Sequence, residues 1–249
     1  MLDAICSFLD EFLRIEEVKD YPNALNGLHL QNDGRVTRIG AAVDASEAVI
    51  EMAVSRQVDL LLVHHGLFWG GLARIVGAQF RKLKRAVSAN LAIYSAHLPL
   101  DLHPDVGNNI RLARALKLGT VEPFFLYQGQ HLGVAISAQI DRDELVDRLR
   151  QVLGRELWVC PGGPAEVRRV GILTGGAGDQ IEKAGKEGID TFITGEGPHH
   201  TFSLAEELGM NLIYGGHYAT ETFGVCALAE RTASQFGLPW SFLDHPSGL

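Results

Sequence analysis

The chain has 249 residues, of which 46% are hydrophobic and 21% charged, so it has enough apolar surface for sizeable cores and too much for a disordered protein. Its 30 acidic and 22 basic side chains give a formal net charge of -8, which disfavours general binding to nucleic-acid phosphates. The apolar runs are far shorter than the roughly 20 residues of a membrane span, and the acidic amino-terminal segment is unlike a signal peptide. We therefore expect a cytoplasmic globular protein with no membrane partner.

Short apolar runs alternate with amphipathic segments in the first part of the chain. Ile39–Asp44, Asp59–Val63 and Ala92–Ala96 are such runs, and helical patterns over Ser46–Arg56 and Gln79–Asn90 separate them. Continuous apolar runs are typical of strands that helices cover on both faces. The pattern therefore predicts an α/β fold.

The alternation resumes after a break at Gly119–Gln130, and a last long helix is expected over about Thr220–Phe236. Between this break and the last helix, alternating strand and helix segments are expected at Leu132–Ile140, Asp141–Leu153, Val170–Thr174, Gln180–Gly188, Asp190–Thr194, Thr201–Leu208 and Asn211–Tyr214. The helix expected over Asp141–Leu153 begins with Asp141 and Glu144, a pattern like a capping box, and is expected to end at Gly154. The chain is interpreted as two α/β lobes, residues 1–123 with 215–249 and residues 124–214.

The two lobes resemble each other in sequence. The separation of Gly40 from Asp59 equals that of Gly171 from Asp190, and from these aspartates DLLLVHHG aligns without a gap with DTFITGEG. A later H-x-x-x-[D/E] pattern also occurs in both halves of the sequence, at His97 with Asp101 and at His217 with Glu221. We expect an internal duplication that brings equivalent strand ends together at a pseudo-two-fold axis. Chance similarity between short β/α units is the alternative.

Two adjacent histidines mark the end of an apolar strand. His64 and His65 follow Leu60–Val63 directly, and open α/β sheets place their ligand crevices at the carboxyl ends of strands. Neighbouring strand residues point to opposite faces, so the pair suits two metal ions better than one. Histidines that are merely hydrogen-bonded at a strand end are the alternative.

Two histidine–carboxylate pairs provide further candidate ligands. His217 and Glu221 are four residues apart, which places them on one helical face, and a carboxylate can bridge two cations. His97 and Asp101 have the same spacing, but Pro99 favours an extended turn, so only one of them is expected to reach a metal. We favour Asp101 as the ligand and His97 as an acid–base residue, because histidine side chains titrate near neutral pH.

Four segments of the chain resemble the signature blocks of a known family. They are HHGLFW from His64, AHLPLD from Ala96, TGEG from Thr194 and GHYATE from Gly216. In this order they resemble the NGG-interacting-factor-three-like family, also called GTP cyclohydrolase I type 2 homologues or dinuclear metal-centre proteins. The chain is similar to its short form, which has no domain inserted between the lobes.

The resemblance implies a dinuclear metal site in the cleft between the lobes. The implied ligands of its two divalent ions are His64, His65, Asp101, His217 and Glu221. Glu221 is expected to bridge the ions and, with His97, to act in catalysis. This mixed donor set suits zinc, manganese, iron or nickel without selecting one. The resemblance also implies a homo-oligomer, a hexameric ring with the metals facing its interior.

A bridged pair of cations makes hydroxide at neutral pH and stabilises developing charge. The leading hypothesis is a metal-dependent hydrolase of a small heterocyclic or phosphorylated metabolite, similar to GTP cyclohydrolase. A non-catalytic metal-binding ring for metal storage or protein interaction is the second hypothesis. Nucleic-acid processing is the third, and the net charge of -8 counts against it. The sequence does not identify the substrate.

Other segments carry weaker signals. The loop from Gly175 to Gly178 is expected to be a tight strand-to-helix turn, with substrate contact as the alternative, and it lacks the Walker and dinucleotide patterns. His199 and His200 are out of register with the ligand pair, so we expect them to line the cleft at most. The three cysteines expected to be reduced packing residues are Cys6, Cys160 and Cys226.

Overall fold

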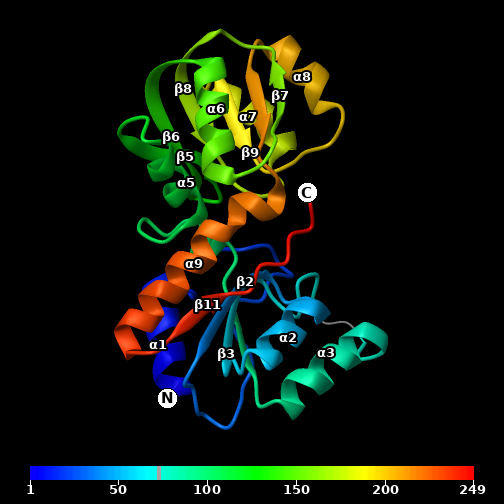
Figure 1. Ribbon diagram of the computed structural model, residues 1–249. Helices are drawn as coiled ribbons and strands as arrows, with labels where there is room; N and C mark the ends of the chain where they lie inside the picture. The colour runs from blue at the N-terminus through cyan, green and yellow to red at the C-terminus, as the bar shows by residue number, and fades with distance from the viewer. Residues whose placement is uncertain (72–73) are drawn as a thin grey trace. The chain divides into compact units, whose positions relative to one another are not determined.

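The computed structural model describes residues 1–71 and 74–249, which form two compact units (Figure 1). The first unit contains Met1–Leu100 and Gly224–His245, and the second contains Asp101–Phe223 and Pro246–Leu249. Each unit is built on its own sheet, which confirms the predicted α/β class. The lobe boundaries expected after residue 123 and before residue 215 stay a prediction. Within the described residues, no helix combines the length and the apolar character that crossing a membrane requires.

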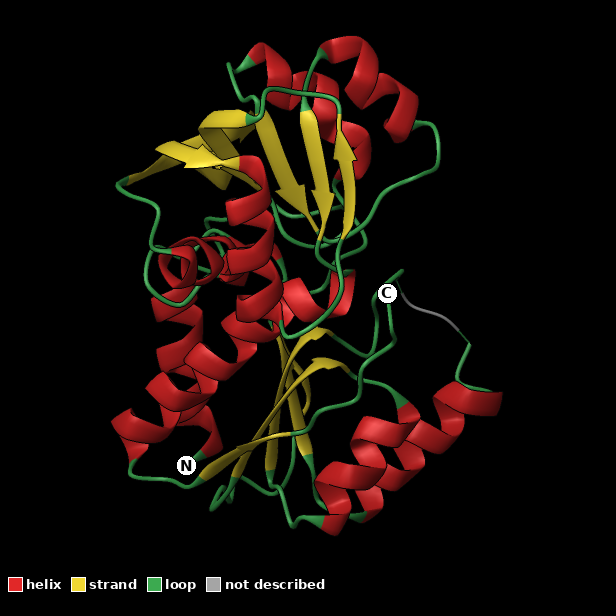
Figure 2. Ribbon diagram, turned by 45° about the horizontal axis from the view of Figure 1, so that its top comes forward, coloured by secondary structure: helices red, strands yellow, loops and turns green. Residues whose placement is uncertain are grey.

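The first unit has a five-stranded sheet in the order β1-β4-β3-β2-β11. Its elements are α1 (Leu2–Leu13), β1 (Gly27–Leu30), β2 (Ile39–Asp44), α2 (Glu47–Ser55), β3 (Leu60–His65), α3 (Gly77–Ser88), β4 (Ala92–Ser95) and β11 (Trp240–Phe242). Helices α2 and α3 cover one face of the sheet, and α1 lies on the other (Figures 1 and 2). Strand β3 runs through the middle, which explains why its run of aliphatic residues is almost completely buried.

The second unit has a six-stranded sheet in the order β5-β6-β8-β9-β10-β7. Its elements are α5 (Asn108–Leu116), β5 (Val121–Tyr127), β6 (Gln130–Asp141), α6 (Arg142–Leu153), β7 (Trp158–Pro161), β8 (Glu166–Ile172), the 3-10 turn η1 (Gly178–Gln180), α7 (Ile181–Lys186), β9 (Thr191–Thr194), α8 (Thr201–Leu208) and β10 (Asn211–Tyr214). Helices α5 and α6 pack their apolar residues on one face of this sheet. Two further helices join the units along the chain, α4 (Leu98–Asp101) and α9 (His217–Phe236).

The same four-strand topology occurs in both units, in agreement with the predicted relationship between the lobes. Strands β2, β3 and β4 are parallel, and β1 pairs with β4 in the antiparallel sense. Strands β8, β9 and β10 repeat this arrangement, with β7 antiparallel to β10. The carboxyl ends of the parallel strands therefore lie at one edge of each sheet, where the candidate site residues follow them.

The aspartates that align the two halves of the sequence also make equivalent contacts. Asp59 Oδ2 accepts hydrogen bonds from the backbone N–H groups of Thr37 (2.6 Å) and Arg38 (3.1 Å). Asp190 Oδ2 accepts the corresponding bonds from Arg168 (2.8 Å) and Arg169 (2.9 Å). Each carboxylate thus satisfies the backbone donors that lie two and three residues before the matched glycine, Gly40 or Gly171.

The matching positions of two glycines have a packing cause. A Cβ added to Gly40 would lie 3.0 Å from a side-chain carbon of Val58, and one added to Gly171 would lie 3.0 Å from a side-chain carbon of Ile189. Val58 and Ile189 each precede one of the matched aspartates. In both units, the side chain that precedes the matched aspartate therefore packs against the space that a Cβ would occupy, and at Gly171 a ring carbon of Phe124 comes as close, at 2.9 Å.

Two sequence expectations about local structure are wrong. The break expected at Gly119–Gln130 contains strand β5, and Pro123 is tolerated there because β5 is an edge strand. The extended turn expected around Pro99 is the short helix α4. Pro99 fits because it lies in the first helical turn, where its missing N–H would have no partner within the helix. The capping prediction for α6 is confirmed: Asp141 accepts from two backbone N–H groups, and Gly154 is left-handed (φ 66°).

Candidate metal centre

Three histidines gather at the carboxyl edge of the first sheet, and we call His64, His65 and His97 the histidine cluster. One ring nitrogen from each lies within 4.8 Å of the other two. The rings of His64 and His65 are 4.8 Å apart at their centroids, because His65 is the last residue of β3, where the regular alternation of side chains ends. His97 follows the end of β4, and its ring is 4.9 Å from that of His64.

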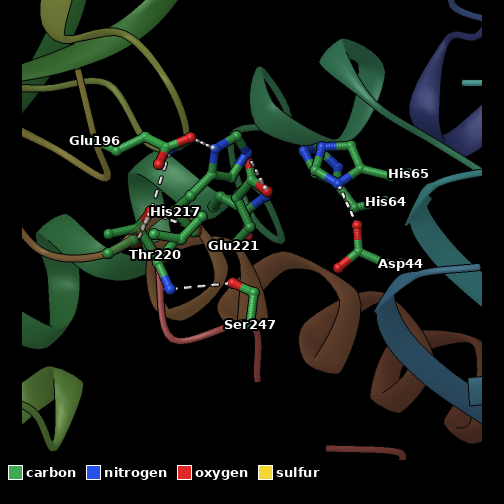
Figure 3. A network of polar contacts seen from close by, with 12 residues as sticks. Asp44, His64, His65, Glu196, His217, Thr220, Glu221 and Ser247 are labelled. Carbon is green, nitrogen blue, oxygen red and sulfur yellow. Dashed lines mark hydrogen bonds and ion pairs between the residues drawn. The ribbon is translucent and has the colours of Figure 1, made fainter. Parts of the chain in front are cut away.

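Each ring of the histidine cluster is held by a hydrogen bond from Nδ1. His64 Nδ1 donates to the backbone oxygen of Ala96 at 2.9 Å. His65 Nδ1 donates to Asp44 at 2.9 Å, as Figure 3 shows, and His97 Nδ1 donates to Asp20 at 2.9 Å. All three acceptors are carbonyl or carboxylate oxygens, which cannot donate a hydrogen bond. The hydrogen of each neutral ring is therefore on Nδ1.

Asp20 and Trp69 complete the surroundings of His97. Burial is the largest single influence on Asp20 and opposes its charged form, but the hydrogen bond and charge of His97, together with hydrogen bonds from Asn26 and Tyr21, outweigh it and lower the pKa of that carboxyl. Asp20 also accepts a bond from Asn26, whose amide oxygen in turn receives the His97 backbone N–H. The Trp69 ring packs edge-on at 4.3 Å from the His97 ring.

The second unit has a histidine between two carboxylates (Figure 3). Helix α9 begins at His217, so His217 and Glu221 occupy one helical face, as their spacing predicts. His217 Nε2 lies 3.2 Å from Glu221 Oε2, and His217 Nδ1 lies 2.8 Å from Glu196 Oε1. Burial alone would lower the pKa of His217, but Glu221 and then Glu196 outweigh it and raise the pKa to about 9. His217 is therefore protonated at neutral pH without a metal.

Asp101 is the first residue of the second unit and lies at the end of α4. Its carboxylate is buried and accepts a hydrogen bond of 2.8 Å from the Asn108 side chain. Asn109 donates to the backbone oxygens of Asp101 and Leu132. Through these bonds the two asparagines hold Asp101 in position.

The glycine loop expected to be a tight turn packs against Glu221 and Glu196 of the second unit. Gly175 has a positive φ of 75°, and a Cβ there would come within 2.3 Å of Glu221 Oε1. Its N–H donates to Thr220 and its oxygen accepts from the Gly195 and Glu196 N–H groups. The loop therefore holds Glu221 and Glu196 in place through its backbone, as the tight-turn interpretation requires.

The remaining sequence candidates do not belong to these groups. His199 and His200 are exposed at the start of α8 and belong to neither candidate metal group within the described part of the chain. All three cysteines are free thiols, and burial raises the pKa of each, to about 11 for Cys6 and Cys226. A high thiol pKa is typical of inert packing cysteines.

Sequence reasoning missed the groups that orient the histidines. Asp20, Asp44 and Glu196 lie in three separate segments, and no local spacing connects them with the rings that they hold. Glu196 alone carried a signal, because it occupies the position that matches His65 in the internal repeat.

The donor chemistry of these groups fits divalent transition metals. Metal-binding histidines usually donate one ring N–H to a carboxylate or a carbonyl, which leaves the other nitrogen to carry the lone pair. His64, His65 and His97 have this arrangement, and Glu221 is a buried carboxylate beside His217. The protein therefore has His and Glu groups that could bind a metal ion.

The chain matches known proteins over its full length. The family model for Duf34/NIF3 (NGG1p interacting factor 3) matches residues 1–247. The GTP cyclohydrolase 1 type 2 homolog of Deinococcus radiodurans is 42% identical over 99% of this chain and 94% of its own. The crystal structure of TTHA1606 from Thermus thermophilus has a TM-score of 0.91 and 41% identity, covering 100% of this chain and 99% of that one.

A more distant solved structure has the same fold. Reduced HcgD from Methanocaldococcus jannaschii is 27% identical, with a TM-score of 0.86, and the match covers 98% of this chain and 97% of that one. Both the sequence and the fold lead to one assignment. The chain belongs to the Duf34/NIF3 (NGG1p interacting factor 3) family.

Proposed function

We propose that the protein is a dinuclear metal-dependent hydrolase of a small heterocyclic or phosphorylated metabolite. In this proposal His65 and Asp101 bind one divalent ion, His64 and His217 bind the other, and Glu221 bridges both. The single observation that carries the proposal is the shared orientation of the imidazoles, each of which has Nδ1 hydrogen-bonded to an oxygen. The family name of the curated relatives, GTP cyclohydrolase 1 type 2 homolog, supports the same reaction class.

The protein groups around the proposed ions have distinct tasks. Bound cations would supply Lewis acidity and a nucleophile at neutral pH. Asn108 would hold the Asp101 carboxylate, and the Gly175 loop would hold Glu221 at its position on α9. The buried Asp20 carboxylate orients His97, so that His97 Nε2 is the atom that takes up or releases a proton.

Metal content distinguishes ligands from acid–base residues. We expect about two ions per chain in the wild type, nearly none in Glu221→Ala, and about one in His64→Ala, because two cations about 3.5–4 Å apart repel strongly without a bridging anion. His97→Ala should keep both ions and lose roughly 10²- to 10⁴-fold in hydrolytic rate. Elemental analysis of the purified variants measures the first quantity, and a metabolite screen with the metal-loaded protein measures the second.

A matched control is His131→Ala, which removes an exposed histidine and should change neither quantity. His97 also belongs to the histidine cluster, so a ligand role for it is the outcome that would reverse the assignment. If Glu221→Ala kept two ions while His97→Ala lost one, the roles of these two residues would have to be exchanged. Two ions per chain without turnover of any metabolite would favour the non-catalytic metal-binding ring instead.

A further inference from the structure

An aromatic pocket lies in the second unit, outside the groups assigned to metal. It has a volume of about 340 Å³ and is lined by Trp158, Gly197, Pro198, His199, Thr201, Phe202 and Tyr214. Ligand pockets typically range from roughly 300 to 1,000 Å³, so this one has room for a single small molecule. We propose that this aromatic pocket binds the planar heterocycle of the substrate, a nucleobase or a similar fused ring. The assignment rests on the proposed function and names its substrate class.

The aromatic side chains form a corner that suits a flat ring. Trp158 begins the edge strand β7 and pairs in register with Tyr214 on β10, and their rings stack at 4.8 Å with an interplanar angle of 20°. Phe202 on α8 meets Trp158 edge-on at 5.9 Å and 67°. Trp158 and Phe202 nevertheless remain 42% and 38% exposed. Two large, partly exposed rings that lie at an angle to each other are a platform on which a heterocycle can stack.

The floor of the pocket is fixed by polar contacts. The hydroxyl groups of Tyr214 and Thr201 are hydrogen-bonded to each other, and Thr201 also donates to the Pro198 oxygen at 2.7 Å. Burial, more than any other cause, raises the pKa of Tyr214, which keeps its hydroxyl protonated. The described residues that line the pocket include no lysine, arginine, aspartate or glutamate. The lining therefore suits a neutral ring, with His199 as a polar group at the rim.

The chain places this pocket next to the candidate metal ligands of the same unit. Gly197 directly follows Glu196, whose carboxylate accepts the His217 Nδ1–H. Tyr214 ends β10, and His217 begins α9 three residues later. Both features follow the carboxyl ends of β9 and β10, the usual position of ligand crevices in α/β sheets. A heterocycle stacked on Trp158 would thus leave its polar substituents free to extend toward the His217–Glu221 pair.

Nucleoside binding to metal-free protein tests the pocket independently of hydrolysis. Guanosine, adenosine and ribose 5-phosphate are titrated by calorimetry into protein in excess EDTA. We expect both nucleosides to bind and ribose 5-phosphate not to bind. Trp158→Ala and Phe202→Ala should each weaken nucleoside binding by roughly 5- to 150-fold, the loss that corresponds to removing one base–aromatic stack. Trp158→Phe should bind within a few-fold of the wild type because it keeps a ring.

The control variant is Leu208→Ala, an exposed apolar residue on the same helix as Phe202 but outside the pocket, which should bind like the wild type. No nucleoside binding at millimolar concentration, or equal binding by Trp158→Ala, would overturn the proposal. If nucleosides bind through Trp158 but the metal-loaded protein hydrolyses no metabolite, the proposed pocket is supported and the proposed hydrolase function is contradicted. If Trp158→Ala hydrolyses a metabolite with an unchanged KM, the proposed hydrolase function is supported and the proposed pocket is contradicted.

Discussion

The ring nitrogens of His64, His65, His97 and His217 each have an oxygen partner that is distant in the sequence or supplied by the backbone. At His217, Glu221 and then Glu196 raise the pKa, because the two carboxylates lie on either side of a single imidazole. In the absence of metal this histidine holds a proton that a metal ion must displace. Metal binding should therefore release protons and compete with acid.

The raised pKa of His217 predicts how the metal-free protein responds to pH. The folded-state pKa of His217, about 9, lies above the ordinary 6.5, so protonated His217 stabilises the folded protein. This stabilisation is fully present below about pH 6.5 and is lost as the pH rises through about 9. Its size is on the order of a few kcal/mol, since one pKa unit corresponds to about 1.4 kcal/mol. The difference in unfolding free energy between wild type and His217→Gln, measured in EDTA from pH 6 to pH 10, should shrink across this range. A difference that stays constant with pH would contradict the prediction.

At the scale of elements, the loop after β8 determines where α9 presents its carboxylate. Gly175→Ala should lower metal content, because its Cβ would collide with Glu221 Oε1 and because φ of 75° is strained for alanine. Gly176→Ala is the matched control, since its Cβ would meet the His217 ring at an ordinary 3.5 Å. Elemental analysis of both variants is the measurement. Equal metal content in the two variants would show that this loop does not position Glu221.

The sequence predicts those elements whose residues carry a regular pattern. The buried run of β3 and the cap of α6 are examples, and the histidines at the end of β3 could be located from the run before them. Strands β1 and β7 were not predicted from the sequence. Each has only four residues and lies at the edge of its sheet, where incomplete burial leaves no continuous apolar run. The Asp20–His97 bond was also out of reach, since its partners are 77 positions apart and no periodicity links them.

At the scale of the whole molecule, the family resemblance implies a hexameric ring, and the oligomeric state is a prediction. Light scattering at micromolar concentration should give six times the chain mass of 27.1 kDa. Leu67 and Phe68, which follow the two adjacent histidines, are poor candidates for a subunit contact, because Leu67 is in the core of the first unit and Phe68 packs against that core. Helix α3 is a better candidate, because Phe80 and Val87 on it are 51% and 63% exposed. We expect Phe80→Glu to reduce the mass, and a monomeric wild type would contradict the hexamer.

The two sheets repeat the same strand arrangement, yet the positions of His64 and His65 in one are taken by Gly195 and Glu196 in the other. In the proposed function, the first unit would thus supply two metal ligands at the positions where the second unit has a carboxylate that orients a ligand. The two proposed metal positions would therefore have different surroundings. Under the proposed assignment, one ion has two nitrogen donors and one oxygen donor, and the other has one nitrogen and two oxygens. Because softer metals favour nitrogen and harder metals favour oxygen, the two positions should fill in sequence and accept a mixed pair of metals.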